Sequence, residues 1–128
     1  DVKEELGIAS VTEELVEELE LLEPFGKANG KPVFAERGLE FKKARILGKN
    51  RNVLKFEVCD TKGTYIDAMF FGDPEEFFGY LSEKYGMNSK ERLLNGCTPG
   101  MLMDITYYPG INEYMGRKSL QIVIKDYR

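Results

Sequence analysis

Six basic residues lie between positions 42 and 55, and no acidic residue interrupts them. Side chains of this type bind phosphate groups, and single-stranded nucleic acid is held by basic grooves that also offer aromatic faces to the bases. A solvated strand face is the plainer interpretation, because Lys and Arg are mostly exposed whether or not they bind anything. The run therefore makes nucleic-acid binding a hypothesis, and it comprises Lys42, Lys43, Arg45, Lys49, Arg51 and Lys55.

The chain contains no histidine, which removes the commonest general base and the commonest metal ligand. Ser/His and Cys/His nucleophilic chemistry is therefore excluded. Cys59 and Cys97 form no CxxC motif and are expected to be buried or idle thiols of a cytosolic protein. A metal site made of carboxylates alone stays open, although the acids beyond the first helix are scattered. We do not expect this chain to be catalytic by itself.

The net charge of −4 hides an uneven distribution along the chain. Residues 1–23 hold nine acids and a single base, Lys3, whereas residues 24–128 hold 17 bases and 13 acids. The local basic run is therefore more informative about partners than the acidic average.

The N-terminal part reads as an amphipathic helix over residues 11–22. Ser10 followed by Glu13 fits a capping box, and apolar residues recur at helical spacing up to Leu22. The opposite face is rich in glutamate. This helix is either a connector to another domain or an ordinary capping helix.

The segment LEPFGKANGKPVF, residues 22–34, predicts a shaped junction after this helix. Pro24 ends the helix, and Pro32 restricts Lys31 to extended conformations. Phe25 and Phe34 are interpreted as packing anchors of the junction.

From Leu39 onwards the apolar period shifts towards two, which is typical of strands. The predicted order is three strands, a helix and two more strands. That pattern is typical of the OB-fold, a mainly β, five-stranded Greek-key barrel with a helix between strands 3 and 4, here preceded by the amphipathic helix. The predicted strands are Leu39–Leu47, Val53–Cys59, Thr64–Phe71, Gly100–Tyr108 and Ser119–Asp126, the predicted helix is Asp73–Tyr85, residues 86–95 are a loop or short helical turn, and residues 48–52 and 109–118 are loops.

In an OB-fold the ligand crosses strands two and three, between the loops that join strands one–two and four–five. Phe56 and Phe70 are assigned to the core, and one of Tyr107 and Tyr108 should point inwards. Asn112 either bonds to the ligand or shapes its loop. The predicted stacking residues are Tyr65, Phe71 and Tyr114, and the predicted phosphate contacts are Lys43, Arg45, Lys49, Arg51, Lys55 and Arg117.

The chain resembles the C-terminal part of RecJ-type single-strand-specific DNA exonucleases of the DHH phosphoesterase superfamily. Three segments carry the resemblance: LEPFGKANGKPVF, ARILGKNRNVLKFEV with YIDAMFFG, and INEYMGRKSLQIVIKDYR. The first matches a family pattern of roughly L-x-PFG-x-G-N-P-x-P-x-F. Ala28 and Gly30 depart from it, since the family usually has Gly and Pro there.

The resemblance implies that this chain is a fragment that holds single-stranded DNA for upstream catalytic domains acting in DNA repair and recombination. Those domains are expected to bind a divalent metal such as Mn or Mg, whereas no cofactor is expected in this chain. Expected partners are single-stranded DNA and the parent's catalytic domains, and a single-strand-binding protein is a further partner that the resemblance allows. The protein is expected to be cytoplasmic, without membrane contact.

We predict a connector and junction over residues 1–37 and the OB-fold over residues 38–128. Two alternatives stay open. The barrel could instead be a protein-interaction module, or a structural brace for the same nuclease.

Overall fold

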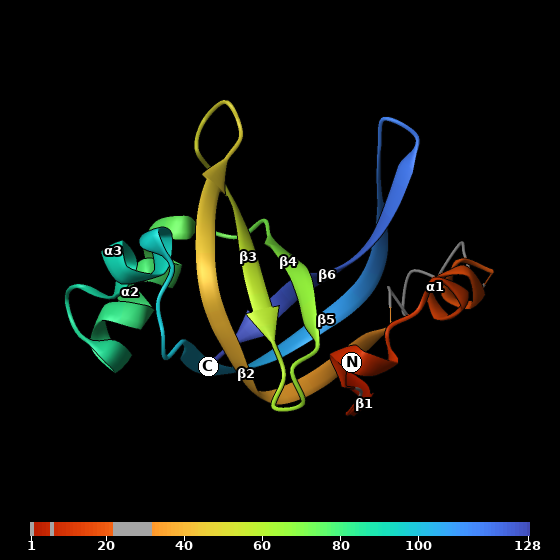
Figure 1. The fold of residues 1–128 in the computed structure, drawn as a ribbon, viewed down its shortest axis with the longest axis horizontal. Helices are drawn as coiled ribbons and strands as arrows, with labels where there is room; N and C mark the ends of the chain where they lie inside the picture. The colour runs from red at the N-terminus through yellow and green to blue at the C-terminus, as the bar shows by residue number, and fades with distance from the viewer. Residues whose placement is uncertain (1, 6, 22–31) are drawn as a thin grey trace.

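The computed structural model describes residues 2–5, 7–21 and 32–128, and it shows a closed barrel (Figure 1). The strands pair in the order β1-β2-β3-β4-β6-β5, and β2 also pairs with β5, which closes the barrel. The pairing of β4 with β6 is parallel. The predicted five-stranded OB-fold is therefore confirmed. Its strands are β2 (Val33–Leu47), β3 (Val53–Cys59), β4 (Tyr65–Phe70), β5 (Met101–Tyr114) and β6 (Arg117–Tyr127).

Helix α2 (Pro74–Tyr85) lies between the third and fourth barrel strands, as predicted. It begins where Asp73 accepts a hydrogen bond from the Glu75 amide at 3.0 Å. Phe77 of this helix is fully buried, with its ring centroid 4.9 Å from that of Phe56. Helix α3 (Ser89–Asn95) follows, so that residues 86–95 contain the short helix that was one of the two predicted alternatives. Both helices lie together on one side of the barrel (Figure 1).

The prediction that residues 109–118 form a loop is wrong. Strands β5 and β6 stay paired up to Tyr114 and Arg117, so that only Met115 and Gly116 form the turn. Both turn residues have positive φ, 51° and 78°, as the tightest hairpin turns require. Pro109 is tolerated within the strand because β2 pairs with β5 only as far as Tyr107, and beyond that point no described strand pairs with this side of β5.

The N-terminal part differs from prediction in its cap. Helix α1 (Glu13–Glu20) is capped by Thr12, whose hydroxyl accepts the Leu15 N–H at 3.0 Å, and not by Ser10. Ser10 instead ends a short 3₁₀ helix, η1 (Ile8–Ser10). A short strand that was not predicted, β1 (Val2–Glu5), runs parallel to the start of β2. Residues 22–31 of the predicted junction, including Phe25, lie outside the described residues.

Strand β2 begins at Val33, six residues earlier than predicted. The sequence alternation breaks at Gly38, where φ is +64° and the register towards β5 shifts. Asp104 of β5 accepts the Gly38 N–H at 2.8 Å and fixes this bulge. The predicted boundary between the connector and junction, residues 1–37, and the OB-fold, residues 38–128, lies at this bulge.

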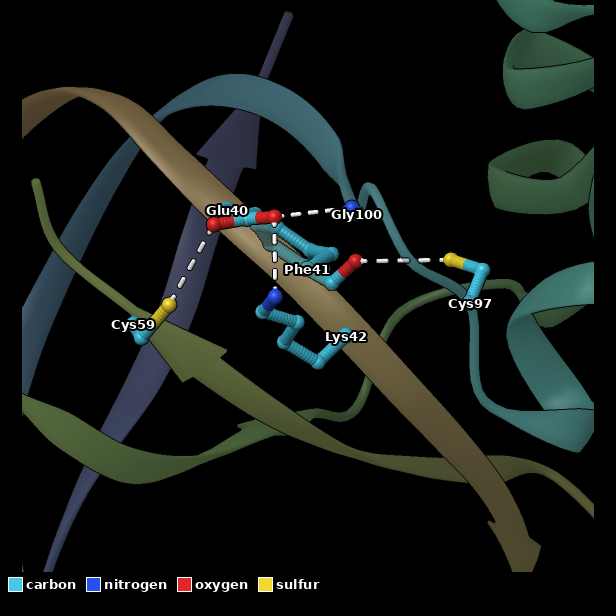
Figure 2. Close-up of polar contacts among 6 residues, drawn as sticks. All are labelled: Glu40, Phe41, Lys42, Cys59, Cys97 and Gly100. Carbon is cyan, nitrogen blue, oxygen red and sulfur yellow. Dashed lines mark hydrogen bonds and ion pairs between the residues drawn. The ribbon is translucent and has the colours of Figure 1, made fainter. Parts of the chain in front are cut away.

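The Glu40 carboxylate joins three segments of the barrel (Figure 2). It accepts the Gly100 N–H at 2.7 Å and forms an ion pair with Lys42 at 3.1 Å. The Cys59 thiol donates to it at 3.5 Å. The hydrogen bond from Gly100, followed by that from Lys42, lowers the pKa of Glu40 below its ordinary value.

The core occupies the barrel interior, where Phe56 and Phe70 are buried as predicted. Tyr107 is the inward member of its pair, and its ring lies 6.2 Å from Phe34 between centroids. Phe34 is therefore a packing anchor against the barrel. Cys59 and Cys97 are buried free thiols, as expected.

Candidate nucleic-acid interface

Two hairpins project from the barrel in the same direction, on either side of β4 (Figure 1). We call the β2–β3 hairpin, residues 43–55, the basic arm. We call the β5–β6 hairpin, residues 109–122, the long arm. The surface between them is the outer face of β3, β4 and β6.

Strand pairing arranges the outward side chains of this surface in two rows, because residues opposite each other share a face. The inward residues between them, such as Ala44, Phe56 and Ala68, are buried in the core. The first row is Arg45, Lys55, Met69, Val123 and Tyr108, and the second is Lys43, Glu57, Asp67, Gln121 and Gly110.

The basic arm gathers five of the six predicted phosphate contacts. Lys43, Arg45, Lys49 and Arg51 are exposed, while Lys55 is partly exposed and pairs with Asp67 at 3.5 Å. Arg45 lies directly opposite Lys55 on the neighbouring strand. A depression of about 220 Å³ is lined by three of these side chains, Lys43, Arg45 and Lys55, and by the carboxylates of Glu57 and Asp67.

Like charges placed opposite each other destabilise a sheet, and a bound anion relieves that repulsion. The Arg45–Lys55 neighbourhood is therefore chemically suited to a phosphate group. By contrast, the carboxylates Glu57 and Asp67 at the centre of the face already have cations beside them. Each faces a lysine, since Lys43 is opposite Glu57 and Lys55 contacts Asp67.

The predicted stacking residues are exposed but do not form one platform. Tyr65, Phe71 and Tyr114 have exposed fractions of 56%, 60% and 67%. Tyr65 pairs with Cys59 at one end of β4, and Phe71 follows the other end. Tyr114 lies near the tip of the long arm, directly opposite Arg117. Asn112 is exposed on the same arm, on a strand and not in a loop.

Sequence reasoning placed one of Tyr107 and Tyr108 outwards without assigning it to the interface, and it missed Lys125. The Lys125 Nζ lies 5.9 Å from the centroid of the Tyr108 ring, which closes the first row with a cation and an aromatic side chain. Both positions alternate with inward residues of their strands, and this alternation is the sequence signal that could have found them.

The described residues contain no group of three His, Cys, Asp or Glu side chains that could hold a metal ion. The carboxylates of Glu57 and Asp67 on the interface face lysines instead. In the same part of the chain, no helix has the length and apolarity needed to cross a membrane.

A family model described as the RecJ OB domain matches residues 2–126. The chain belongs to the RecJ OB domain family. It is also 27% identical over 120 residues to the single-stranded-DNA-specific exonuclease RecJ of Bacillus subtilis. That match covers 94% of this chain and 13% of the relative, so the chain spans about an eighth of that protein's length.

Among solved structures, this RecJ OB domain is similar to RecJ in complex with Mg2+ from Thermus thermophilus. The TM-score is 0.53 at 21% identity, covering 89% of this chain and 14% of that chain. A mitochondrial single-stranded DNA binding protein of S. cerevisiae, Rim1, aligns with a TM-score of 0.45 at 17% identity, over 75% of this chain and 91% of that one. The likeness to the Thermus protein supports the fold.

Proposed function

We propose that this RecJ OB domain binds single-stranded DNA across the outer face of β3 and β4, between the basic arm and the long arm. The observation that carries the proposal is the cross-strand juxtaposition of Arg45 and Lys55 within a cluster of exposed bases on one arm. Membership of the RecJ OB domain family supports the same ligand.

In this proposal the basic arm binds the phosphate backbone of the DNA strand. Phosphate contacts depend on charge and position and do not read sequence. Lys49 and Arg51 extend the basic surface to the tip of the arm, and Arg117 supplies a cation on the opposite arm. A strand running between the arms therefore meets cations on both sides.

The bases are held by stacking in this proposal. Phe71 and Tyr114 lie towards the long arm, and stacking on such rings contributes roughly 1–3 kcal/mol per base for any sequence. Tyr65 lies at the beginning of β4, at the end remote from Phe71. Only a DNA strand that crosses the full length of β4 would therefore contact Tyr65. Asn112 on the long arm can donate or accept a hydrogen bond at the same edge.

In the longer protein we propose a RecJ-like exonuclease that acts in DNA repair and recombination in the cytoplasm. This domain would hold substrate, while cleavage and the divalent metal, such as Mn or Mg, belong to other domains. The match to only 13% of the Bacillus relative is consistent with that division of labour.

Fluorescence anisotropy of labelled single strands across a salt series tests the proposal. Two to four phosphate contacts give a log–log slope of about −1.4 to −2.8. The double variant K49A/R51A should flatten the slope. Lys62→Ala is the matched control, since Lys62 lies on the turn at the other end of β3 and should leave the slope unchanged.

A protein-binding role is the second candidate, because Tyr114 and Met115 expose apolar surface at the tip of the long arm, 67% and 85% respectively. No single-strand binding even at low salt, or equal affinity for duplex competitor, would reject the DNA proposal and favour the protein-interaction or bracing role.

A further inference from the structure

A cavity lies on the outer side of the barrel, where α1 packs beside β5. Its volume is about 360 Å³, within the range of roughly 300–1,000 Å³ that is typical of small-molecule sites. Helix α1 supplies Val16, Leu19 and Glu20, and Phe71, Tyr108 and Gln121 belong to the barrel side.

This cavity continues the proposed DNA surface. The first row of outward residues runs from Arg45 and Lys55 through Met69 to Val123 and Tyr108, and the last two line the cavity. Val123 points outwards and is still only 7% exposed. Phe71 lines the cavity while remaining 60% exposed, so its ring is available to a strand that lies on the open face.

The α1 side of the cavity disfavours phosphate. Helix α1 exposes a row of glutamates, and Glu20 itself lines the cavity, whereas the Lys125 ammonium lies over the Tyr108 ring on the barrel side. A phosphate placed against α1 would be repelled. A neutral, flat base meets apolar walls at Val16 and Leu19, aromatic rings at Phe71 and Tyr108, and an amide at Gln121.

Gly110 keeps this space open. Its backbone does not have positive φ, so no conformational requirement calls for glycine here. Among the described residues, a Cβ at this position would meet Gln121 alone, with its Cγ and Nε2 both at 3.9 Å, which is ordinary contact. The missing side chain therefore contributes room to the cavity.

We propose that this cavity, the base pocket, receives one unpaired nucleobase of the bound single strand, with a preference for bases that carry an exocyclic amino group. The Glu20 carboxylate accepts a hydrogen bond from such an amino group. Thymine offers only its ring N3–H, which is flanked by two carbonyl oxygens that a carboxylate repels. This inference rests on the proposed single-strand binding and adds a base site to it.

The test compares oligo(dC) with oligo(dT) of equal length by anisotropy, because cytosine carries the amino group and thymine does not. We expect the chain to favour oligo(dC) by about 3- to 10-fold, the value of one hydrogen bond. Glu20→Gln should narrow this ratio. Gly110→Leu, which fills the pocket, should erase the preference and weaken oligo(dC) binding by about 5- to 30-fold through loss of one stacked base.

Gly79→Leu on the exposed face of α2 is the matched control, because a Cβ there would meet no atom of the described residues within 4 Å. If Gly110→Leu unfolds, as judged by circular dichroism, Gly110→Val replaces it, since its smaller side chain enters the same space, and it should also weaken oligo(dC) binding.

Three outcomes overturn part of the proposal, and each is distinct. If neither oligonucleotide binds to the wild-type chain, the proposed function fails. If both oligonucleotides bind and the folded Gly110 variant, Gly110→Leu or Gly110→Val, does not weaken oligo(dC) binding, the base pocket is rejected while the proposed function stands. If these variants weaken both oligonucleotides equally, the pocket stands and the amino-group preference is rejected.

Discussion

The Glu40 carboxylate and the Gly100 amide lie 2.7 Å apart, at the point where β2 passes the beginning of β5 (Figure 2). A Cβ on Gly100 would stand 2.6 Å from the Glu40 Cγ and 2.7 Å from the Phe41 carbonyl oxygen. The close approach of two backbones therefore requires glycine at this position.

Gly100→Ala should lower the free energy of unfolding by about 1–3 kcal/mol, because the Phe41 carbonyl oxygen belongs to the backbone and cannot move aside cheaply. Urea unfolding measures this. Gly79→Ala in the exposed part of α2 is the control, and it should raise the free energy of unfolding by roughly 0.5–1 kcal/mol through helix propensity. Equal stability of the two variants would contradict the packing argument.

The stabilising contribution of the Glu40 contacts should fall at acidic pH. Its pKa is lower in the folded chain than the ordinary value of 4.5, so the unfolded chain binds more protons in that range. The contribution of Glu40 to stability is therefore present above about pH 4.5 and is lost as the pH falls through the lower folded value. Glu40→Gln should show a shallower loss of stability between about pH 5 and 3. Urea midpoints over this range, with Glu83→Gln on α2 as the charge-matched control, measure the difference.

Glu36 should have the opposite pH dependence. Partial burial raises its pKa above 4.5, although the Ile8 N–H donates to its carboxylate at 2.6 Å. The folded chain therefore binds more protons, and stability falls as the pH rises from 4.5 through the raised value. Glu36→Gln keeps an oxygen for the Ile8 N–H and removes the charge. Its urea midpoint, relative to wild type, should be higher at pH 7 than at pH 4.5; a constant difference would rule this out.

Arg45→Gln separates binding from stability. Removing one of two opposed cations should raise the free energy of unfolding by about 0.2–0.5 kcal/mol. It should also weaken single-strand binding and make the salt slope less negative by about 0.7. Unfolding and anisotropy measured on the same preparation test both effects. A variant that binds as tightly as wild type would remove Arg45 from the interface.

Arg51 at the tip of the basic arm has φ of +54°, a conformation that costs most residues about 1–2 kcal/mol. Arg51→Gly should therefore raise the free energy of unfolding by about 0.5–1 kcal/mol after the entropy of glycine is counted. Arg51→Ala should bring no such gain. Both variants should lose the same affinity for single strands if the charge is what matters, and anisotropy measures this.

Local sequence signals predicted most of the barrel. Alternation in residues 53–59 and 65–70 placed the inward and outward side chains of β3 and β4, because strand geometry sets the side-chain direction residue by residue. Asp73 and Pro74 marked the start of α2 for an equally local reason. The exposed positions of Lys43, Arg45, Tyr65 and Phe71 followed from the same alternation.

Long-range contacts decided the rest. Gly and Asn in residues 109–118 predicted a loop, yet pairing with β6 extends β5 to Tyr114. No local pattern in these residues indicates that pairing. The position of Tyr65 opposite Cys59 follows from the register of β4 with β3. The base pocket exists only because α1 packs on the outside of the barrel, next to a glycine whose missing side chain leaves room. The sequence by itself determined the inward and outward alternation, the start of α2 and the basic run. Only the tertiary structure decided which of these surfaces meet, since strand pairing and helix packing join residues far apart in the chain.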